Sequence, residues 1–325
     1  MPIYRCNQCG LVQEDTQTPI HTQTACSRCG TACTVYGTVF YVEELVKRLA
    51  TLTREVKTLQ ANAAAAQAAP STAPNTAPAT PKAQAPRTAP APQLAQWFAQ
   101  RKIQAELDPS TVDTSGFFDE AAQALGKNYG LLAELLDRVC YAYRKSYPSV
   151  NLDLSKLAQK ESQIITQFCR NLYEHTFFTR SHYQKPEKIL RLNLQSAPAV
   201  RQFFEGAWLE WFALMQILSL PSVQSQGLSY ARSVKVTFPN EDLHELDVVC
   251  LLPNDSLLCI ECKSGEFRRD IDKYLRLAKR LGIPKAQFII CAADLSDEQA
   301  RGLSAMYDLS FANLQTLPEL LQRLF

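Results

Sequence analysis

The sequence predicts a multidomain protein with a cysteine-rich N-terminal module, an all-α middle domain and a C-terminal α/β domain. The chain has 325 residues, which leaves room for roughly two domains of ordinary size. Five cysteines fall within the first 33 residues, and a stretch of alanine and proline separates them from the remainder. After Pro198, helical periodicity gives way to alternating strand and helix patterns, the signature of an α/β domain.

Composition excludes several classes of protein. The 34 basic and 32 acidic side chains leave a net charge of +2, so the chain is no polycation and any affinity for nucleic acid must come from local patches. No apolar run approaches the ~18 residues of a membrane span, and Met1–Arg5 lacks an apolar signal core. An odd total of 11 scattered cysteines argues against a secreted disulfide framework. We therefore expect a cytoplasmic protein with reduced thiols and no membrane partner.

The first motif is a pair of C-x-x-C knuckles, Cys6/Cys9 and Cys26/Cys29, each followed by glycine and separated by sixteen residues. Four thiolates at this spacing suit tetrahedral Zn²⁺, and the intervening segment is too polar to fold without a metal. The pattern resembles the zinc-ribbon families, so residues 1–40 are identified as a structural zinc ribbon. A redox dithiol is the alternative, and Cys33 and His21 are spare ligand candidates.

Residues 41–60 carry an unbroken heptad pattern with charged residues on the other faces, which predicts a short coiled-coil helix. Self-association through residues 42–59 would make the protein a homo-oligomer; the alternative is an amphipathic helix that packs on the chain's own ribbon. The apolar positions are Val42, Leu45, Leu49, Leu52, Val56 and Leu59.

Residues 61–92 contain fourteen alanines and seven prolines, a composition that favours an extended, semi-rigid linker. Residues 93–198 then read as an all-α domain, with helices expected at 93–107, 117–125, 129–147 and 155–173.

Residues 199–325 begin with a helix, 199–218, that is apolar nearly all round and therefore buried. Glu210 lies in its middle, where a carboxylate needs a cation, either a side chain or a metal. Strands follow at 233–238, 246–252, 257–263 and 286–291, with helices at 296–308 and 316–324. Strand alternation puts Glu261 and Lys263 on one face, and a short hairpin turn places Leu246 or Asp247 roughly opposite Lys263.

One aspartate, one glutamate and one lysine thus converge at a strand edge. Two carboxylates can hold a divalent cation that activates water, and a lysine can orient that water. Asp247 and the Glu261-Cys262-Lys263 triplet resemble the PD-(D/E)XK motif of the restriction-endonuclease-like superfamily, with Leu246 in place of the usual proline. Glu210 matches the helical acidic residue that many members add as a further ligand.

Within that superfamily, residues 199–325 look most like the nuclease domain of CRISPR-ancillary endonucleases that cyclic oligoadenylate activates. Those enzymes carry an N-terminal Rossmann-like sensor, which this sequence lacks, so activation by cyclic oligoadenylate is not implied here. The resemblance implies a restriction-endonuclease-like domain, phosphodiester hydrolysis of DNA or RNA with Mg²⁺ or Mn²⁺ held by Glu210, Asp247 and Glu261, and a role in defence against foreign nucleic acid.

A basic stripe follows directly after Lys263 and predicts contact with backbone phosphates, although a solvated helix face is the simpler interpretation. Two other functions remain open, a non-catalytic nucleic-acid-binding scaffold and a redox or metal-sensing regulator. The basic side chains concerned are Arg268, Arg269, Lys273, Arg276 and Arg280.

Overall fold

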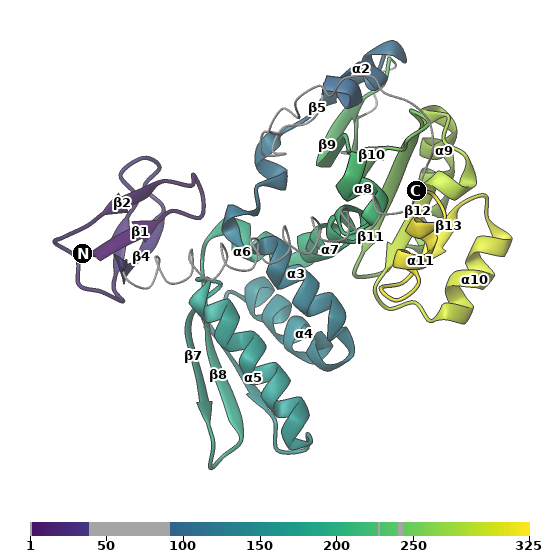
Figure 1. Cartoon of the computed structure of the whole chain (residues 1–325). Coiled ribbons are helices and arrows are strands. Elements are labelled where there is room, and N and C mark those ends of the chain that lie inside the picture. Colours follow the sequence, from purple (N-terminus) through teal and green to yellow (C-terminus); the bar gives the residue numbers. More distant parts are fainter. Residues whose placement is uncertain (1, 39–91, 227, 240–242) are drawn as a thin grey trace, which may run out of the picture. The chain divides into compact units, whose positions relative to one another are not determined.

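The computed structural model describes residues 2–38, 92–226, 228–239 and 243–325, in two compact units, Met1–Arg87 and Thr88–Phe325 (Figure 1). The predicted coiled-coil helix (41–60) and all but the last residue of the predicted linker (61–92) lie outside the described residues, so self-association and the linker stay predictions. Within the described ranges, no helix combines the length and the apolar character that crossing a membrane requires.

The N-terminal unit is a four-stranded antiparallel sheet in the order β2-β1-β4-β3. Its small core consists of Tyr4, Val35 and three of the cysteines. So small a core cannot stabilise a sheet by apolar burial alone, which agrees with the expectation that a metal stabilises this unit. The strands are β1 (Pro2–Arg5), β2 (Val12–Glu14), β3 (Gln23–Ala25) and β4 (Ala32–Gly37).

The second unit is built on a six-stranded mixed sheet in the order β13-β12-β11-β10-β9-β5. β11, β12 and β13 are parallel, whereas β5, β9, β10 and β11 pair antiparallel. The carboxyl ends of the three parallel strands therefore meet at one edge. The strands are β5 (Gln104–Glu106), β9 (Tyr230–Thr237), β10 (Leu243–Leu251), β11 (Leu257–Lys263), β12 (Phe288–Ala292) and β13 (Ser310–Ala312).

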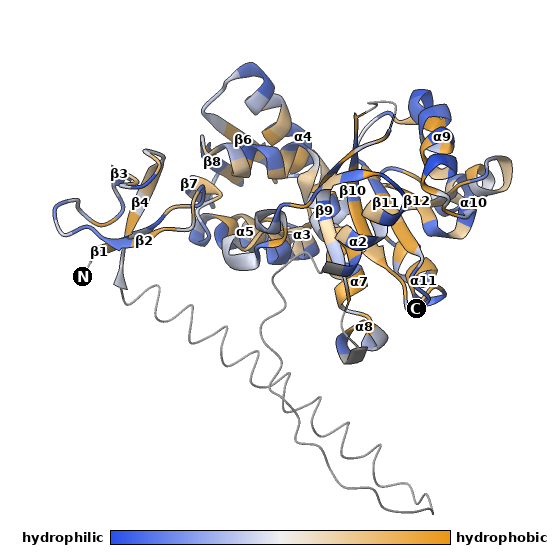
Figure 2. Ribbon diagram, turned by 90° about the horizontal axis from the view of Figure 1, so that it is seen from above, coloured by the Kyte–Doolittle hydropathy of each residue, from blue (hydrophilic) through white to orange (hydrophobic). Residues whose placement is uncertain are grey.

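Helices cover both faces of this sheet, as the predicted α/β domain requires. α7 (Trp208–Leu218) and α11 (Leu317–Gln322) contribute to one core, and α2 (Pro92–Gln100), α9 (Ile271–Leu281) and α10 (Asp297–Met306) contribute to the other. Figure 2 shows α7 and the central strands as largely hydrophobic, while α9 carries a hydrophilic side. Because the sheet is buried on both faces, its central strands are near-continuous apolar runs, which made these strands predictable from the sequence.

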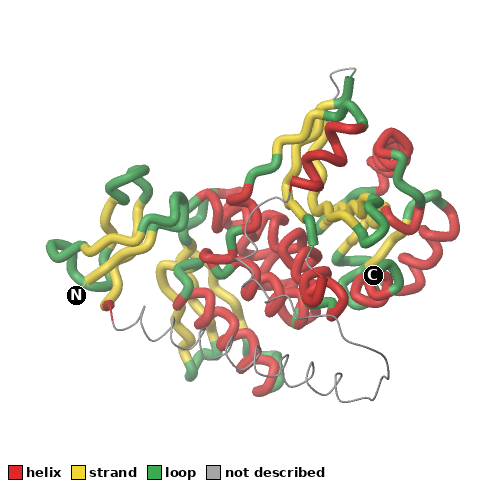
Figure 3. Tube along the Cα trace, turned by 45° about the horizontal axis from the view of Figure 1, so that its top comes forward, coloured by secondary structure: helices red, strands yellow, loops and turns green. Residues whose placement is uncertain are grey.

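The prediction that residues 93–198 are all-α is wrong. Besides α2, this range contains the helices α3 (Phe118–Lys127), α4 (Tyr129–Lys145) and α5 (Gln159–Glu174). They are joined by a three-stranded antiparallel sheet in the order β6-β8-β7, and α5 lies along it (Figures 1 and 3). The strands are β6 (Ser149–Asp153), β7 (Phe178–Gln184) and β8 (Ile189–Leu194). β6 and β8 alternate apolar and polar residues, which is a strand signal that the helical prediction overlooked.

The expected helix 93–107 is also too long. α2 ends at Gln100, Lys102 takes a positive φ of 58°, and β5 then pairs with β9 of the central sheet. The predicted boundary at residue 198 stays a prediction, but one core combines residues from both sides of it, including Leu135 and Trp208.

The expected helix 199–218 is interrupted by a π-helical turn. α6 (Pro198–Gln202) runs into the π turn Phe203–Ala207, and α7 follows without a loop. Gly206 has φ 153°, a conformation that a side chain would strain. Wider turns of this kind are frequent at functional sites.

Two glycines test the packing between α3 and α7. A Cβ on Gly126 would lie 2.3 Å from the Phe212 ring, whereas a Cβ on Gly302 of α10 would meet open space. We expect Gly126→Ala to destabilise the protein by about 1–3 kcal/mol through overpacking. Gly302→Ala should instead stabilise it by about 0.5–1 kcal/mol through helix propensity. Urea unfolding measures both, and a shift of the same sign in the two variants would contradict the packing described.

Candidate active site

The first structural feature of the site is a break in strand alternation at Asp247. Leu246 and Val249 both belong to the core beneath α9, although residues three apart on a regular strand face opposite sides. β9 breaks at the paired position, where Ser233 has φ 52°. Irregularities of this kind re-aim side chains, and the break in β10 falls at Asp247.

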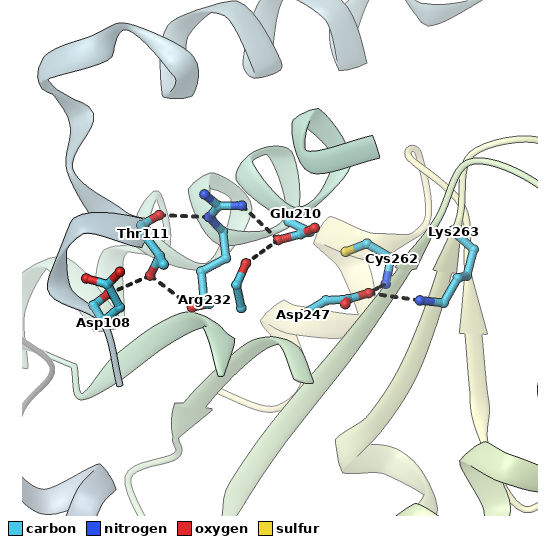
Figure 4. Close-up of polar contacts among 8 residues, drawn as sticks. Asp108, Thr111, Glu210, Arg232, Asp247, Cys262 and Lys263 are labelled. Atoms are coloured by element: carbon cyan, nitrogen blue, oxygen red, sulfur yellow. Dashed lines mark hydrogen bonds and ion pairs between the residues drawn. The ribbon is translucent and has the colours of Figure 1, made fainter. Parts of the chain in front are cut away.

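Asp247 lies against the end of β11. Its Oδ2 accepts the backbone N–H of Cys262 at 2.7 Å and a hydrogen bond from Lys263 Nζ at 3.0 Å (Figure 4). The observed register pairs Val248 with Ile260, so Asp247 lies nearer to the level of Glu261 than the sequence analysis expected. The convergence of Asp247 with Lys263 nevertheless occurs, through side chains instead of direct pairing.

Glu261 is the most deeply buried charge of the group, at 3% exposure. Its Oε2 lies 3.3 Å from Lys263 Nζ, and its Oε1 is buried with no hydrogen-bond partner in the described part of the chain. Glu261 and Lys263 therefore share a strand face, as predicted. A buried carboxylate oxygen without a partner costs free energy, which is the situation that a bound cation relieves.

Glu210 on α7 is held by a partner that the sequence did not indicate. Its Oε2 accepts hydrogen bonds from Arg232 Nη1 at 2.7 Å and from Ser233 Oγ at 3.0 Å. Arg232 also donates from Nε to the Thr111 carbonyl and packs over the Trp211 ring at 4.5 Å. The cation predicted for Glu210 is thus a side chain, and Figure 4 shows the second carboxylate oxygen directed away from Arg232.

Glu210, Asp247 and Lys263 line one hollow of about 350 Å³. Its remaining wall comes from the π turn before α7 and the loop after β11, where Gly206 approaches Ser264. Glu261 lies behind Lys263 and does not line the hollow. The oxygens of Glu210, Asp247 and Glu261 do not all lie within 4.8 Å of one another. The structure thus brings three of the four predicted residues to one hollow and the fourth, Glu261, beside Lys263.

Burial and like charge shift the acid–base equilibria of the site. Burial raises the pKa of Glu210 to about 7, against the opposing effect of Arg232. Burial and the Asp247 charge raise the pKa of Glu261 to about 8. Although burial opposes it, the carboxylates of Asp247 and Glu261 raise the pKa of Lys263 above its usual value. Perturbed groups that share a hollow are typical of functional sites.

The basic stripe lies on and before α9, and its five side chains are exposed. Arg268 forms an ion pair with Glu266 at 3.2 Å, and the Arg280 guanidinium lies 3.8 Å from the centre of the Phe238 ring. Ile271 and Tyr274 of the same helix are buried, so the amphipathic pattern is confirmed. Contact of this stripe with nucleic acid stays a prediction.

The four predicted cysteine ligands also come together, in the N-terminal unit. All four Sγ atoms of Cys6, Cys9, Cys26 and Cys29 lie within 4.8 Å of one another, with Cys6–Cys29 at 3.4 Å and Cys9–Cys26 at 3.6 Å. Tetrahedral zinc–sulfur bonds of about 2.3 Å imply sulfur separations of about 3.8 Å. The cluster could therefore hold a metal such as zinc.

The knuckle geometry supports this cluster. Gly10 and Gly30 adopt φ of 69° and 74°, and each N–H donates to the carbonyl of the first cysteine of its pair. Burial raises the pKa of Cys6 to about 11, while hydrogen bonding to Thr31 lowers the pKa of Cys29 to about 6. Four thiolates would not form together here unless a cation compensates their charge.

Comparisons with known proteins identify similar solved structures but no family. No protein-family model matches the chain, and no curated protein matches it. Among solved structures, protein VC1899 from Vibrio cholerae is similar with a TM-score of 0.48 and 20% identity, over 71% of this chain and 60% of that one. Can2 from Sulfobacillus thermosulfidooxidans, solved with cyclic tetra-adenylate, is similar with a TM-score of 0.49 and 15% identity, over the same shares. The match spans about 60% of each structure's length, and similarity of this degree assigns no function.

Metal analysis tests the cysteine cluster. The purified full-length protein should retain one zinc per chain after dialysis, and Cys26→Ser should lose it, because three sulfurs hold the ion far less tightly than four. Cys33→Ser is the matched control, since Cys33 lies in the small core but outside the cluster. Elemental analysis of both variants measures the effect; a zinc-free wild type, or a reversible Cys6–Cys9 disulfide, would favour the redox alternative.

The pKa shifts predict how stability depends on pH. Glu210 and Glu261 hold protons in the folded chain up to pH of about 7 and 8, compared with an ordinary value of 4.5. Their contribution is therefore complete below pH 4.5 and is lost as the pH rises through these values. The melting temperature of the metal-free protein should fall between pH 5 and 8.5, and Glu261→Gln should flatten this dependence. A steeper profile in Glu261→Gln would contradict the assignment.

Proposed function

We propose that the chain is a metal-dependent nuclease that hydrolyses phosphodiester bonds of DNA or RNA. The observation that carries this proposal is the hollow beside β11, where Asp247, Glu210 and Lys263 meet in front of the buried Glu261. Carboxylates that share a lysine at the end of a strand are the donor set of a hard divalent cation beside a phosphate. The resemblance of these residues to the PD-(D/E)XK motif supports the same reaction.

Asp247 and Glu261 would hold Mg²⁺ or Mn²⁺, with Glu210 as a further ligand. The unpartnered Oε1 of Glu261 supports this fit, because a buried oxygen without a donor is available to a cation. Such an ion, when bound, lowers the pKa of a coordinated water and screens the charge of the phosphate.

The chain's own residues orient the reactants. Lys263 stays protonated near neutral pH, so it would position the water and a phosphate oxygen as a hydrogen-bond donor and would not act as the base. Arg232 holds Glu210 in place through two elements at once, and the Cys262 N–H fixes one oxygen of Asp247. In the reaction, the water oxygen bonds to phosphorus and releases a proton to solvent, the bond to the leaving sugar oxygen breaks, and that oxygen takes up a proton from solvent.

The other parts of the chain fit this proposal. Zn²⁺ on the four cysteines would stabilise the N-terminal ribbon, and residues 42–59 would pair two chains, so that two nuclease sites act on one nucleic acid; light scattering of the intact protein tests the pairing. A cytoplasmic setting remains part of the proposal, because the 11 cysteines are odd in number and scattered along the sequence. We include defence against foreign nucleic acid in the proposal because the motif resembles that of CRISPR-ancillary endonucleases.

Cleavage assays test the proposal directly. The full-length protein with Mn²⁺ or Mg²⁺ should cut at least one of four substrates, single- or double-stranded DNA or RNA. Glu261→Gln and Asp247→Asn should each lower the rate by about a hundredfold or more, the scale expected when a charge that stabilises the transition state is removed. Gel electrophoresis of labelled substrates measures the rates.

A matched control separates loss of the site from loss of charge. Glu298→Gln removes an exposed carboxylate on α10 and should leave cleavage unchanged. Equal rates for the wild type and Glu261→Gln would contradict the assignment of Glu261. Binding of nucleic acid without any cleavage by the wild type would favour the non-catalytic scaffold.

A further inference from the structure

A second hollow lies next to the candidate nuclease site, at the carboxyl ends of β12 and β13. It has a volume of about 840 Å³ and is walled by α3, α4 and α7 on one side and by the loops after β12 and β13 on the other. Crevices outside the carboxyl ends of parallel strands are common ligand sites in open α/β sheets. The site residues described above leave this hollow unexplained.

The two hollows are connected through the sheet. Ala293, which lines the larger hollow, donates its backbone N–H to the Lys263 carbonyl at 3.1 Å. Tyr129, another lining residue, stacks on Trp208 with ring centres 5.4 Å apart, and Trp208 directly follows Ala207 of the smaller hollow. These contacts fix the larger hollow relative to Lys263 within the second unit.

The lining suits a nucleobase. The floor is apolar and includes the buried side chains of Phe212, Leu295 and Leu314, whose surfaces a planar base can cover. The mouth carries the amides of Gln123, Gln216 and Gln315, and each offers a donor and an acceptor of the kind that pairs with base edges.

The hollow has one basic and one acidic side chain in its lining, Lys127 and Asp297. Lys127 is exposed at the rim, where it can reach a phosphate. Of the acidic groups on this side, Asp294 accepts a hydrogen bond from the Tyr129 hydroxyl at 2.7 Å, and Asp297 accepts one from the Asn313 amide at 2.7 Å. The acidic groups thus have partners within the protein.

We propose that this hollow is a nucleotide subsite, which takes one unpaired nucleotide of the strand whose neighbouring phosphate lies at Lys263. This inference rests on the proposed nuclease function and adds to it how the strand is held. A hollow of about 840 Å³ has room for a nucleotide, and a base enters such a hollow only after it has left the stack of its strand.

Filling the hollow tests the subsite. A Cβ on Gly130, which lines the hollow, would meet open space, so Gly130→Phe should occupy the volume without straining the fold. Gly302→Phe is the matched control on the exposed surface of α10. Fluorescence anisotropy with labelled single-stranded DNA and RNA, in full-length protein that also carries Glu261→Gln, measures affinity without cleavage. Gly130→Phe should weaken binding by about tenfold, as expected when one stacked base is displaced.

A second variant keeps the test independent of folding. Gln216→Ala leaves the hollow open and should weaken binding several-fold by removing one amide. Affinities of Gly130→Phe and Gln216→Ala within twofold of Gly302→Phe would overturn the subsite. If the wild type cleaves nucleic acid and Gly130→Phe cleaves it with the same KM, the nuclease stands and the subsite falls. If no protein cleaves but Gly130→Phe still loses affinity, the subsite stands and the nuclease falls.

Discussion

The burial of charge at the end of β11 is the constraint on which the rest of the site depends. Glu261 is almost completely removed from water, which raises its pKa, and its strand neighbour Lys263 is the cation beside it. Asp247 accepts a hydrogen bond from the same Lys263 ammonium and another from the backbone N–H of Cys262. Removing any one member would leave a buried charge or donor unpaired, which is far more costly than never burying the group. The electrostatic cluster and the end of the sheet therefore form as one unit.

A second charge pair ties distant segments to this unit. Arg232 contacts Glu210 on α7 with one nitrogen and the backbone of Thr111 with another, while the Thr111 hydroxyl donates back to the Arg232 carbonyl. The chain around residue 111 precedes the helices of the middle region, and the core of that region continues into α7. The site is thus assembled from segments more than 120 positions apart in the sequence. Such a site requires the whole second unit to fold before its geometry exists.

The sequence predicted what periodic burial dictates and missed what depends on neighbours. α9 and β9 were predictable because their apolar residues repeat at helix or strand spacing, and α7, β11 and β12 because they are apolar throughout. β5 was not, since three residues form a strand only because β9 lies beside them. The convergence of Asp247 with Lys263 followed from residue types and the short turn. Arg232 had no such signal, because the break at Ser233 that turns it toward Glu210 is a tertiary feature.

The π-helical turn before α7 sets the direction in which Glu210 points. Such a turn contains one residue more than the α-helix that it interrupts, and each residue rotates a helix by about 100°. Deleting a single residue within Phe203–Ala207 would turn α7 relative to α6 and swing Glu210 about a quarter-turn from the hollow. Both the number of residues in this turn and the glycine at position 206 therefore determine whether α7 contributes to the site.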